Sequence, residues 1–291
     1  MVGRPRGRGA AFAVAVGIAC AAGAAGARGA GAASAGTRAA DPFPGAARAY
    51  VVVRNGATLW SARADDPLPP ASLTKLMTAL LVVEAGALDE TVTIGPRAAA
   101  TQGARLPLRA GMHVSRGDLL TAMLLRSAND ACVALAEAVG GDEASFVAAM
   151  NRRAAALGLV HTRFRNPCGL DATGHVASAA DLATLAEAAL AAPAIASRVR
   201  LESAVVRRGD DAPLVIASTN ALIGRVQGAI GAKTGFTNRA GHCLVGVVER
   251  DGVRVTVVLL GARDRWWDAV AMIERAFDGG SLPAPLRPRG G

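Results

Sequence analysis

Ser72 and Lys75 stand three residues apart in the segment Ser-Leu-Thr-Lys, at the start of an apolar-periodic stretch. This stretch, residues 72–85, predicts a helix, which would place both side chains on one face with the serine at the positive end of the helix dipole. A serine hydroxyl is a weak nucleophile until a base takes its proton, and a lysine is such a base only when burial and a nearby cation lower its pKa. The pair therefore predicts a nucleophile, Ser72, and its general base, Lys75.

Two later motifs supply the other polar groups that such a site needs. Ser127 and Asn129, at a predicted turn between two helices, can point into one cleft, where the serine would pass a proton to a leaving amine and the asparagine would hold an amide. Lys233, Thr234 and Gly235 are predicted to open a short strand. The lysine and the threonine can bind a carboxylate there, and the glycine lets a substrate backbone approach closely.

The use of lysine singles out the same motifs. Of the 32 basic residues, 30 are arginines, and only Lys75 and Lys233 are lysines. Arginine keeps its proton at ordinary pH whereas a desolvated lysine can lose one, so the two lysines indicate sites that need an amine. Taken singly, the three motifs also fit a helix start, a helix N-cap and a turn. Their order and their possession of both lysines favour one active site, in which Lys233 is the cation near Lys75.

The elements that must position these residues are strands near both ends of the chain and helices between them. Asn55-Gly56 and Asp251-Gly252 are hairpin signals, flanked by predicted strands at residues 48–54 and 57–62, and at 243–249 and 253–260. Further predicted elements are a short strand at 91–94 and helices at 115–126, 129–139, 143–157, 179–191 and 266–277. The pattern predicts an α+β fold with one antiparallel sheet, a terminal helix packed on it, an all-helical lobe and a ligand cleft between them.

The basic charge of the chain is concentrated at its ends. The formal net charge is +9, but seven arginines lie before Asp41 or after Leu286, and the stretch between carries 25 bases against 23 acids. The folded part therefore lacks the basic stripe of a nucleic-acid-binding protein, and six Phe, three Trp and one Tyr are too few for a base-stacking surface. We expect no nucleic-acid partner.

The first 27 residues have the pattern of a secretory signal peptide. Arginines at positions 4, 6 and 8 precede an uncharged run of small apolar residues from Ala10 to Ala27. An uncleaved membrane anchor is the alternative, but the alanine- and glycine-rich run favours cleavage, which leaves no stable anchor. Residues 28–47 predict a flexible lead-in, 48–281 a single catalytic domain and 282–291 a disordered tail.

The cysteines and histidines predict no metal site and no cofactor. Cleavage of the signal would leave Cys132, Cys168 and Cys243, an odd number without a C-x-x-C pair, so neither a disulfide framework nor structural zinc is expected. Cys132 lies in an apolar helical pattern and is expected to be a buried small residue. A bridge between Cys168 and Cys243 has no support in the sequence, and the four histidines are scattered.

Four segments of the chain resemble the D-alanyl-D-alanine carboxypeptidase family, the low-molecular-mass penicillin-binding proteins of serine peptidase family S11. The segments are PASLTKLMTA (70–79), SANDA (127–131), NPCGL (166–170) and AKTGFTNRAGHCLV (232–245), and the similarity runs from about Tyr50 to Phe277. The resemblance implies the fold shared by serine β-lactamases and penicillin-binding-protein transpeptidases. It also implies export to the periplasm or the extracytoplasmic cell-wall space.

The resemblance implies a serine-type carboxypeptidase that removes the terminal D-alanine from peptidoglycan stem peptides. Ser72 would be acylated, with Lys75 as its general base and with Ser127 and Asn129 as the second catalytic pair. Water would resolve the acyl-enzyme. β-Lactam antibiotics would bind covalently to the same serine.

The substrate-binding groups are implied in the same way. Lys233 and Thr234 would recognise the terminal carboxylate, with Gly235 beside them. The backbone N–H groups of Ser72 and Phe236 would form the oxyanion hole. For two arginines that could also hold the carboxylate, Arg263 and Arg265, a solvated surface role is expected instead.

The sequence departs from the family pattern at three places. Ala128 replaces a common glycine, Cys168 replaces an expected histidine, and the length beyond Phe277 predicts a single-domain form without a second β-rich domain. Three other functions remain open. They are a D,D-endopeptidase that cuts cross-links, a β-lactamase, and a non-catalytic cell-wall-binding protein. The β-lactamase is disfavoured because no E-x-x-L-N segment lies between Asn129 and Lys233, and the binding protein because every catalytic residue is present.

Overall fold

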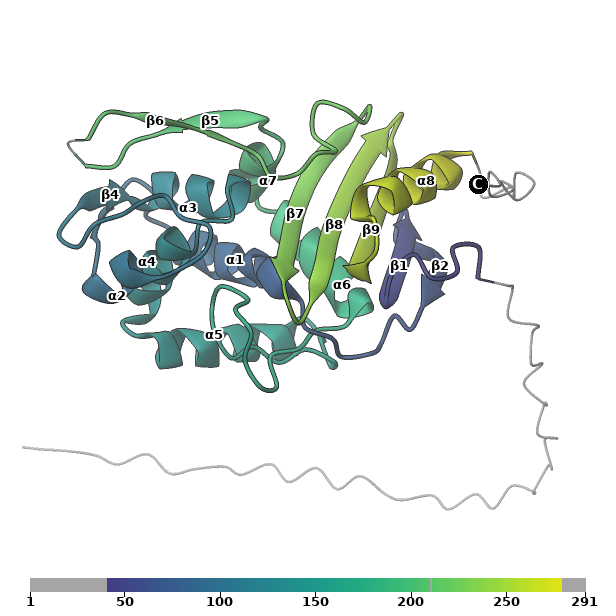
Figure 1. Ribbon diagram of the computed structural model, residues 1–291, viewed down its shortest axis with the longest axis horizontal. Helices are drawn as coiled ribbons and strands as arrows, with labels where there is room; N and C mark the ends of the chain where they lie inside the picture. The colour runs from purple at the N-terminus through teal and green to yellow at the C-terminus, as the bar shows by residue number, and fades with distance from the viewer. Residues whose placement is uncertain (1–40, 210, 279–291) are drawn as a thin grey trace, which may run out of the picture. The chain divides into compact units, whose positions relative to one another are not determined.

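The two ends of the described chain meet in one antiparallel sheet. The computed structural model describes residues 41–209 and 211–278, and its main sheet has the strand order β2-β1-β9-β8-β7 (Figure 1). The strands are β1 (Ala49–Arg54), β2 (Ala57–Ala62), β7 (Ala229–Thr237), β8 (Gly241–Arg250) and β9 (Val253–Ala262). Pairing of β1 with β9, with Val51 opposite Val258, joins the two predicted hairpins. Both hairpins and the sheet are confirmed.

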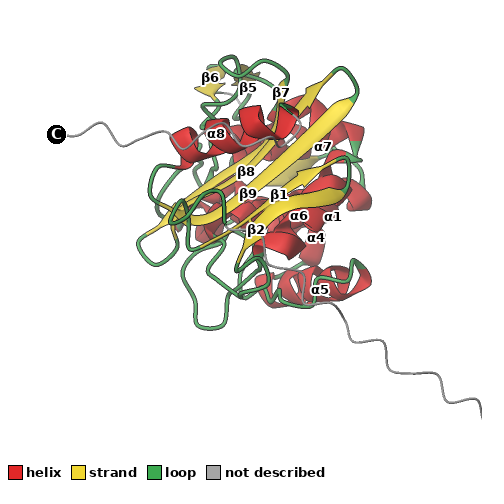
Figure 2. Ribbon diagram, turned by 90° about the vertical axis from the view of Figure 1, so that its right-hand side faces the viewer, coloured by secondary structure: helices red, strands yellow, loops and turns green. Residues whose placement is uncertain are grey.

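Strand β9 is apolar on both faces because both faces of the sheet are covered. Val257 and Leu259 belong to a core with Met272 of α8 (Arg265–Phe277), whereas Val258 belongs to the core of the other helices. Successive residues of a strand point to opposite faces, so one strand serves two cores. Figure 2 shows α8 along one face of the sheet and the other helices on the opposite side.

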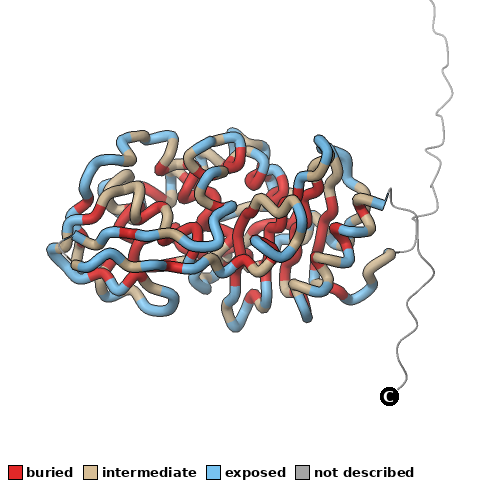
Figure 3. Tube along the Cα trace, turned by 90° about the horizontal axis from the view of Figure 1, so that it is seen from above, coloured by how far each residue is buried: buried red, intermediate tan, exposed pale blue. Residues whose placement is uncertain are grey.

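Helix α1 (Lys75–Ala85) lies in the middle of the helical part, and seven of its eleven residues are buried. It packs against five other helices, and the buried segments run through both the helices and the sheet (Figure 3). The five are α3 (Arg116–Leu125), α4 (Asn129–Gly140), α5 (Glu143–Ala156), α6 (Ala179–Leu190) and α7 (Pro193–Val199). The first four of these and α8 confirm the predicted helices.

The middle of the chain is not all helical, which corrects the prediction. The strands β3 (Thr91–Thr93) and β4 (His113–Ser115) pair with each other, as do β5 (Ser203–Val206) and β6 (Leu214–Ala217). Strand β3 confirms the short strand predicted at 91–94. The other three were not predicted, because strands of three or four residues are too short to show an alternating pattern. Helices α2 (Pro96–Ala100) and α7 were not predicted, although each has a proline in its first turn.

Two element boundaries differ from the sequence-based expectation. The predicted helix from Ser72 begins as a 3-10 turn, η1 (Ala71–Thr74), and α1 starts at Lys75. Strand β7 begins at Ala229, so Lys233 lies within the strand and does not open it. The residues before Lys233 are Ala-Ile-Gly-Ala, which give no alternating pattern from which the strand could be predicted.

Cys132 of α4 and Cys168 form a disulfide, which corrects the prediction of a buried free Cys132. The two are 36 residues apart and share no local motif, so only the tertiary fold brings them together. Cys243 is free and buried, so the structure does not contain the Cys168–Cys243 bridge either.

Residues 41–47 pack against the sheet, so the lead-in predicted for residues 28–47 ends earlier. The Asp41 carboxylate accepts a hydrogen bond from the Tyr50 hydroxyl, and the Phe43 ring packs edge-on against Trp60. The predicted signal peptide and the predicted tail lie outside the described residues. Within 41–209 and 211–278, no single helix is long and apolar enough to cross a membrane, and only α6 with α7, joined across a bend of 105°, reaches that length.

Candidate active site

Ser72 sits in a tight turn between strand β7 and the loop of residues 166–170. The residue before it, Ala71, has a φ of 49°, a left-handed conformation that is uncommon outside glycine. A Cβ on Gly235 would lie 3.0 Å from the Ser72 nitrogen, and a Cβ on Gly169 would lie 1.8 Å from the Ala71 oxygen. Two glycines therefore let the neighbouring backbones approach the turn from both sides.

Lys75 points its amine at Ser72 from the first turn of α1. Its Nζ lies 2.8 Å from the Ser72 Oγ, 2.9 Å from the Asn129 Oδ1 and 2.6 Å from the Cys168 carbonyl oxygen. The Lys75 side chain is fully buried. Burial lowers its pKa well below the ordinary lysine value, and the charge of nearby Lys233 lowers it further.

If the Lys75 amine is neutral, each of its N–H donors and its lone pair has one partner in this site. A neutral lysine carries two N–H donors and one lone pair, whereas the ammonium form carries three donors. The Asn129 Oδ1 and the Cys168 carbonyl can only accept, so they take the two donors. The lone pair is then left for the hydroxyl proton of Ser72. The geometry therefore suits a lysine that withdraws the proton from the serine.

Asn129 is held by hydrogen bonds to the segment of residues 102–108. Its backbone N–H donates to the Ala104 oxygen at 2.7 Å, and its side-chain Nδ2 donates to the Gln102 oxygen at 2.8 Å. The buried carboxylate of Asp130 accepts from the backbone N–H groups of Leu106 and Leu108. Asp130 thus fixes the same segment to the start of α4.

Ser127, the third predicted catalytic residue, lies in the turn between α3 and α4. Its φ is 62°, which is unfavourable for a residue with a side chain. The residue lines a cleft of about 450 Å³ together with Ser72, Asn129, Thr234, Gly235 and Phe236. The structure therefore brings six of the eight predicted site residues to one surface.

The other two predicted site residues, Lys75 and Lys233, lie behind the cleft wall. Lys233 is 1% exposed, and its Nζ donates to the Thr234 oxygen at 2.9 Å. Burial, followed by the charge of Arg265, lowers the Lys233 pKa to about 7. The charge of Lys233 lowers the pKa of Lys75. Binding of the carboxylate by Lys233 stays a prediction.

Arg265 supplies the cation at the cleft surface, where the sequence predicted only a solvated side chain. Its guanidinium donates to the Gly235 oxygen at 2.9 Å and stacks on Trp266. It also lines the cleft. Arg263, the other arginine considered, is exposed and does not line this cleft. In the sequence, both arginines simply follow β9, so their positions did not show which of the two would line the cleft.

His175 is a second residue that the sequence analysis missed. It is buried, its Nε2 lies 2.9 Å from the Thr74 Oγ1, and its Nδ1 accepts from the Arg165 N–H at 3.0 Å. Because Nδ1 accepts, Nε2 carries the proton and donates to Thr74, whose hydroxyl donates to the Ala71 oxygen. This chain of bonds ties the turn that carries Ser72 to the segment around Arg165.

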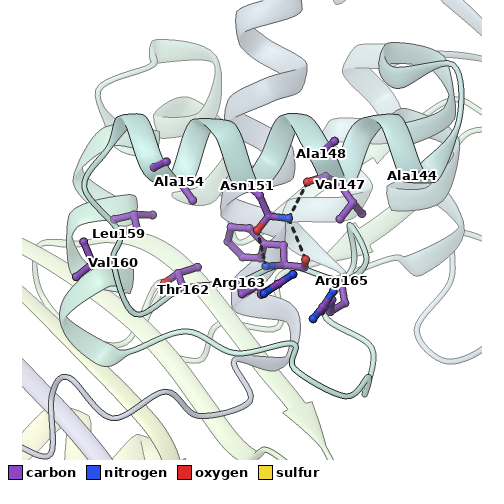
Figure 4. Close-up of a pocket in the computed structure, with 12 residues that line it drawn as sticks. Ala144, Val147, Ala148, Asn151, Ala154, Leu159, Val160, Thr162, Arg163 and Arg165 are labelled. Carbon is purple, nitrogen blue, oxygen red and sulfur yellow. Dashed lines mark hydrogen bonds between the residues drawn. The ribbon is translucent and has the colours of Figure 1, made fainter.

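A larger hollow lies elsewhere in the described structure. It measures about 810 Å³ between α5 and residues 159–165, and Asn151 bridges its walls by donating to Val147 and Phe164 (Figure 4). None of the motif residues lines it. The chemistry therefore belongs to the smaller cleft.

A sequence profile of D-alanyl-D-alanine carboxypeptidases, peptidase family S11, matches residues 36–264. The chain belongs to this family. The family and its fold, both predicted from the four segments, are thus confirmed.

Curated relatives of this family are similar to the chain over most of its length. A D-alanyl-D-alanine carboxypeptidase of Bacillus subtilis is 33% identical over 251 residues, which cover 83% of this chain and 64% of the relative. A D-alanyl-D-alanine endopeptidase of Pseudomonas aeruginosa is 37% identical over 211 residues, covering 71% of this chain and 68% of that protein. The chain thus spans slightly less than two thirds of the carboxypeptidase and slightly more than two thirds of the endopeptidase.

Solved structures of two similar proteins have the same fold. An ampicillin-bound penicillin-binding protein of Listeria monocytogenes superposes with a TM-score of 0.72 at 34% identity, covering 80% of this chain and 97% of that one. A Streptomyces DD-transpeptidase superposes with a TM-score of 0.76 at 28% identity, covering 80% and 97%.

Proposed function

We propose that the chain is a serine D,D-carboxypeptidase that releases the terminal D-alanine of peptidoglycan stem peptides through an acyl-enzyme on Ser72. The observation that carries this proposal is the distance of 2.8 Å between the buried Lys75 Nζ and the Ser72 Oγ, which lines an open cleft. Family membership supports the substrate class. The names of the curated relatives support the same reaction.

In the acylation step, Ser72 Oγ attacks the carbonyl carbon between the two D-alanines while its proton passes to Lys75. The negative charge that develops on the carbonyl oxygen faces the N–H groups of Ser72 and Phe236. The C–N bond then breaks. Ser127 passes a proton to the departing amine and receives the proton that Lys75 had accepted, so Lys75 is neutral again and Ser72 remains esterified. Lys75 then takes a proton from the water that attacks the ester and returns it to the Ser72 oxygen as the ester bond breaks, and the shortened peptide leaves.

The carboxylate of the terminal D-alanine is bound beside Thr234 and Arg265, which line the cleft together with Ser127. Arg265 presents a guanidinium there, and the Thr234 hydroxyl lies 2.7 Å from that of Thr219. A guanidinium binds a carboxylate with two parallel hydrogen bonds, whereas a lysine such as Lys233 acts as a point charge.

A D,D-endopeptidase is the second candidate. The observation that favours it is the Pseudomonas aeruginosa endopeptidase, which is 37% identical to the chain and of which the chain covers 68%. A cross-link cut by such an enzyme also presents a D-alanyl carbonyl to the serine, so the catalytic groups would be the same. Only the leaving group differs.

Slow release of penicillin follows from the composition of the cleft. Among the residues of the described chain that line it, none is an aspartate or a glutamate. The cleft therefore offers no carboxylate base to activate a water on the acyl-enzyme. This arrangement supports a penicillin-binding enzyme over a β-lactamase.

The site of action that we propose is the extracytoplasmic cell-wall space. The predicted signal peptide supports export, and the Cys132–Cys168 disulfide supports an oxidising compartment. Peptidoglycan, the substrate of the family, is assembled there.

The test is the intact mass of the protein during incubation with benzylpenicillin, beside the Ser72→Ala variant. A lasting single adduct on the wild type, absent from the variant, is expected. Rapid drug loss without an adduct would indicate a β-lactamase, and an intact drug without an adduct would refute the nucleophile. Release of D-alanine from a pentapeptide, compared with cleavage of a cross-linked dimer, then separates the two candidates.

A further inference from the structure

The two acceptors that orient the Lys75 amine come from segments that are far apart in the sequence. One is the Asn129 Oδ1 at the start of α4, and the other is the Cys168 carbonyl in the loop of residues 166–170. Cys132 lies three residues after Asn129, so the two side chains share one face of the helix. The disulfide to Cys168 therefore joins the two segments beside the amine that both of them bind.

The loop of residues 166–170 packs against the Ser72 turn at Gly169 and against α1 at Pro167. Asn166 closes it by accepting from the N–H groups of the next residues, and the Pro167 oxygen accepts from Thr78 at 2.6 Å. Gly169 touches the Ala71 backbone. A shift of this loop would therefore move the Cys168 carbonyl away from Lys75. It would also change the packing of Gly169 against the Ser72 turn.

We propose that the Cys132–Cys168 disulfide positions Lys75, and that fast acylation of Ser72 requires these two cysteines to be oxidised to the disulfide. The proposal rests on the proposed function, because it concerns the base of that reaction. The bond fixes the Cys168 carbonyl, and with it the direction of the amine lone pair. Without the bond, Thr78 and Asn166 still hold the loop, so acylation slows and is not abolished.

The oxidation step needs a disulfide-bearing oxidant. The two thiols lose two protons and two electrons, the S–S bond forms, and the oxidant is reduced to a dithiol. Both sulfurs are buried, with 0% and 1% of their residues exposed, so the bond forms during folding and resists reduction afterwards. A chain that folds in a reducing compartment would hold a weakened base. The enzyme would then reach full activity only after export.

The experiment compares the oxidised protein, the protein unfolded and refolded with dithiothreitol, and the variants Cys132→Ala and Cys168→Ala. Alkylation in denaturant, followed by mass spectrometry, should show two additional free cysteines after reduction. Stopped-flow acylation by benzylpenicillin then separates the dissociation constant of the encounter complex from the acylation rate constant. We expect the rate constant to fall between about tenfold and a hundredfold in the reduced protein and in both variants, with the dissociation constant unchanged.

Controls separate positioning from a general loss of stability. Met272→Ala opens a cavity in the core on the far side of the sheet, so it should lower the melting temperature without changing the acylation rate constant. Reoxidation of the reduced wild type should restore the rate, and dithiothreitol should not affect either cysteine variant further.

Three results would overturn the proposal. They are a wild-type acylation rate in the cysteine variants, a fall no larger than that in Met272→Ala, and free thiols at both cysteines in the isolated protein. In each of these results the wild type still forms its Ser72 adduct, so the proposed function stands. Absence of the adduct from the oxidised wild type would instead refute the proposed function.

Discussion

The Nε2 of His175 and the hydroxyl oxygen of Thr74 lie 2.9 Å apart, although 101 residues separate them in the sequence. The contact ties the turn of Ser72 to a neutral imidazole. Burial is the main cause of a His175 pKa lowered to about 4, with the charges of Arg165 and Lys75 adding to it and Asp171 opposing it. The imidazole therefore stays uncharged while it holds the turn.

This pKa makes the stability of the fold depend on pH. The folded His175 takes up a proton only near pH 4, whereas the unfolded histidine does so near 6.5. Between these values the unfolded state binds more protons, so stability falls as the pH drops from about 6.5 to 4 and is fully retained above 6.5. We expect His175→Gln to be less stable than the wild type at pH 7.5, with the gap narrowed by roughly 2 kcal/mol at pH 4.5.

Urea unfolding at the two pH values measures that gap. The exposed His161 provides the matched control, because His161→Gln should leave both the stability and its pH dependence close to the wild type. A gap that stays constant from pH 7.5 to 4.5 would show that His175 is not the titrating group.

The second prediction concerns the charge of Lys233 and the pH dependence of acylation. Lys233 lowers the pKa of Lys75, second only to burial. A neutral Lys233→Met should therefore raise the Lys75 pKa and move the acid limb of the acylation rate to higher pH. Below the Lys233 pKa of about 7, Lys233→Arg keeps the charge of the wild type. An acid limb in that range should therefore stay in place in this variant even if the rate itself falls. The rate of acylation by benzylpenicillin is measured from pH 5 to 10 for the wild type and both variants. Acid limbs at the same pH in all three proteins would exclude an electrostatic coupling between the two lysines.

Gly235 gives the third prediction, which concerns the space next to the oxyanion hole. An alanine Cβ there would lie 3.0 Å from the Ser72 nitrogen and 3.0 Å from the Ala71 Cβ. We expect Gly235→Ala to slow acylation by about a hundredfold, the cost of losing one oxyanion donor, with only a small change in melting temperature. Gly95→Ala is the control, since its Cβ would meet only the Glu137 carboxylate at 3.1 Å. A wild-type acylation rate in Gly235→Ala would contradict the prediction, because it would mean that the Ser72 turn shifts to accept the added Cβ without disturbing the oxyanion hole.

The sequence predicted the parts of this site that depend on local spacing, and it missed the parts that depend on tertiary contacts. Ser72 and Lys75 are three residues apart in a helical stretch, so their contact follows from the helix repeat. His175, Cys168 and Arg265 reach the site from remote segments, and no periodicity links them to Ser72. The sheet was predictable for a similar reason, because hairpin turns are local signals.

The placement of Lys233 shows the same limit in another way. The motif correctly predicted that the charge of Lys233 would act on Lys75. It did not predict that Lys233 would lie behind the cleft wall with only 1% of the residue exposed. Whether a side chain in a strand points to the cleft or to the core depends on strand register, and the residues before Lys233 gave no alternation to set it. Arg265, one of the two arginines considered for the carboxylate, was therefore expected on the surface, although it lines the cleft.

The last prediction tests Arg265 as the group that binds the carboxylate. Its guanidinium lines the cleft and also donates to the Gly235 oxygen, so it can orient both the substrate and β7. Arg265→Lys keeps a positive charge but loses the paired donors, and we expect the KM for a D-Ala-D-Ala peptide to rise about tenfold with a smaller change in kcat. Arg263→Lys, at an exposed arginine outside the cleft, should leave both constants unchanged. A D-alaninamide-terminated peptide lacks the carboxylate, so the loss on Arg265→Lys should shrink with it. An equal loss with both peptides would show that Arg265 acts by holding β7 and not by binding the carboxylate.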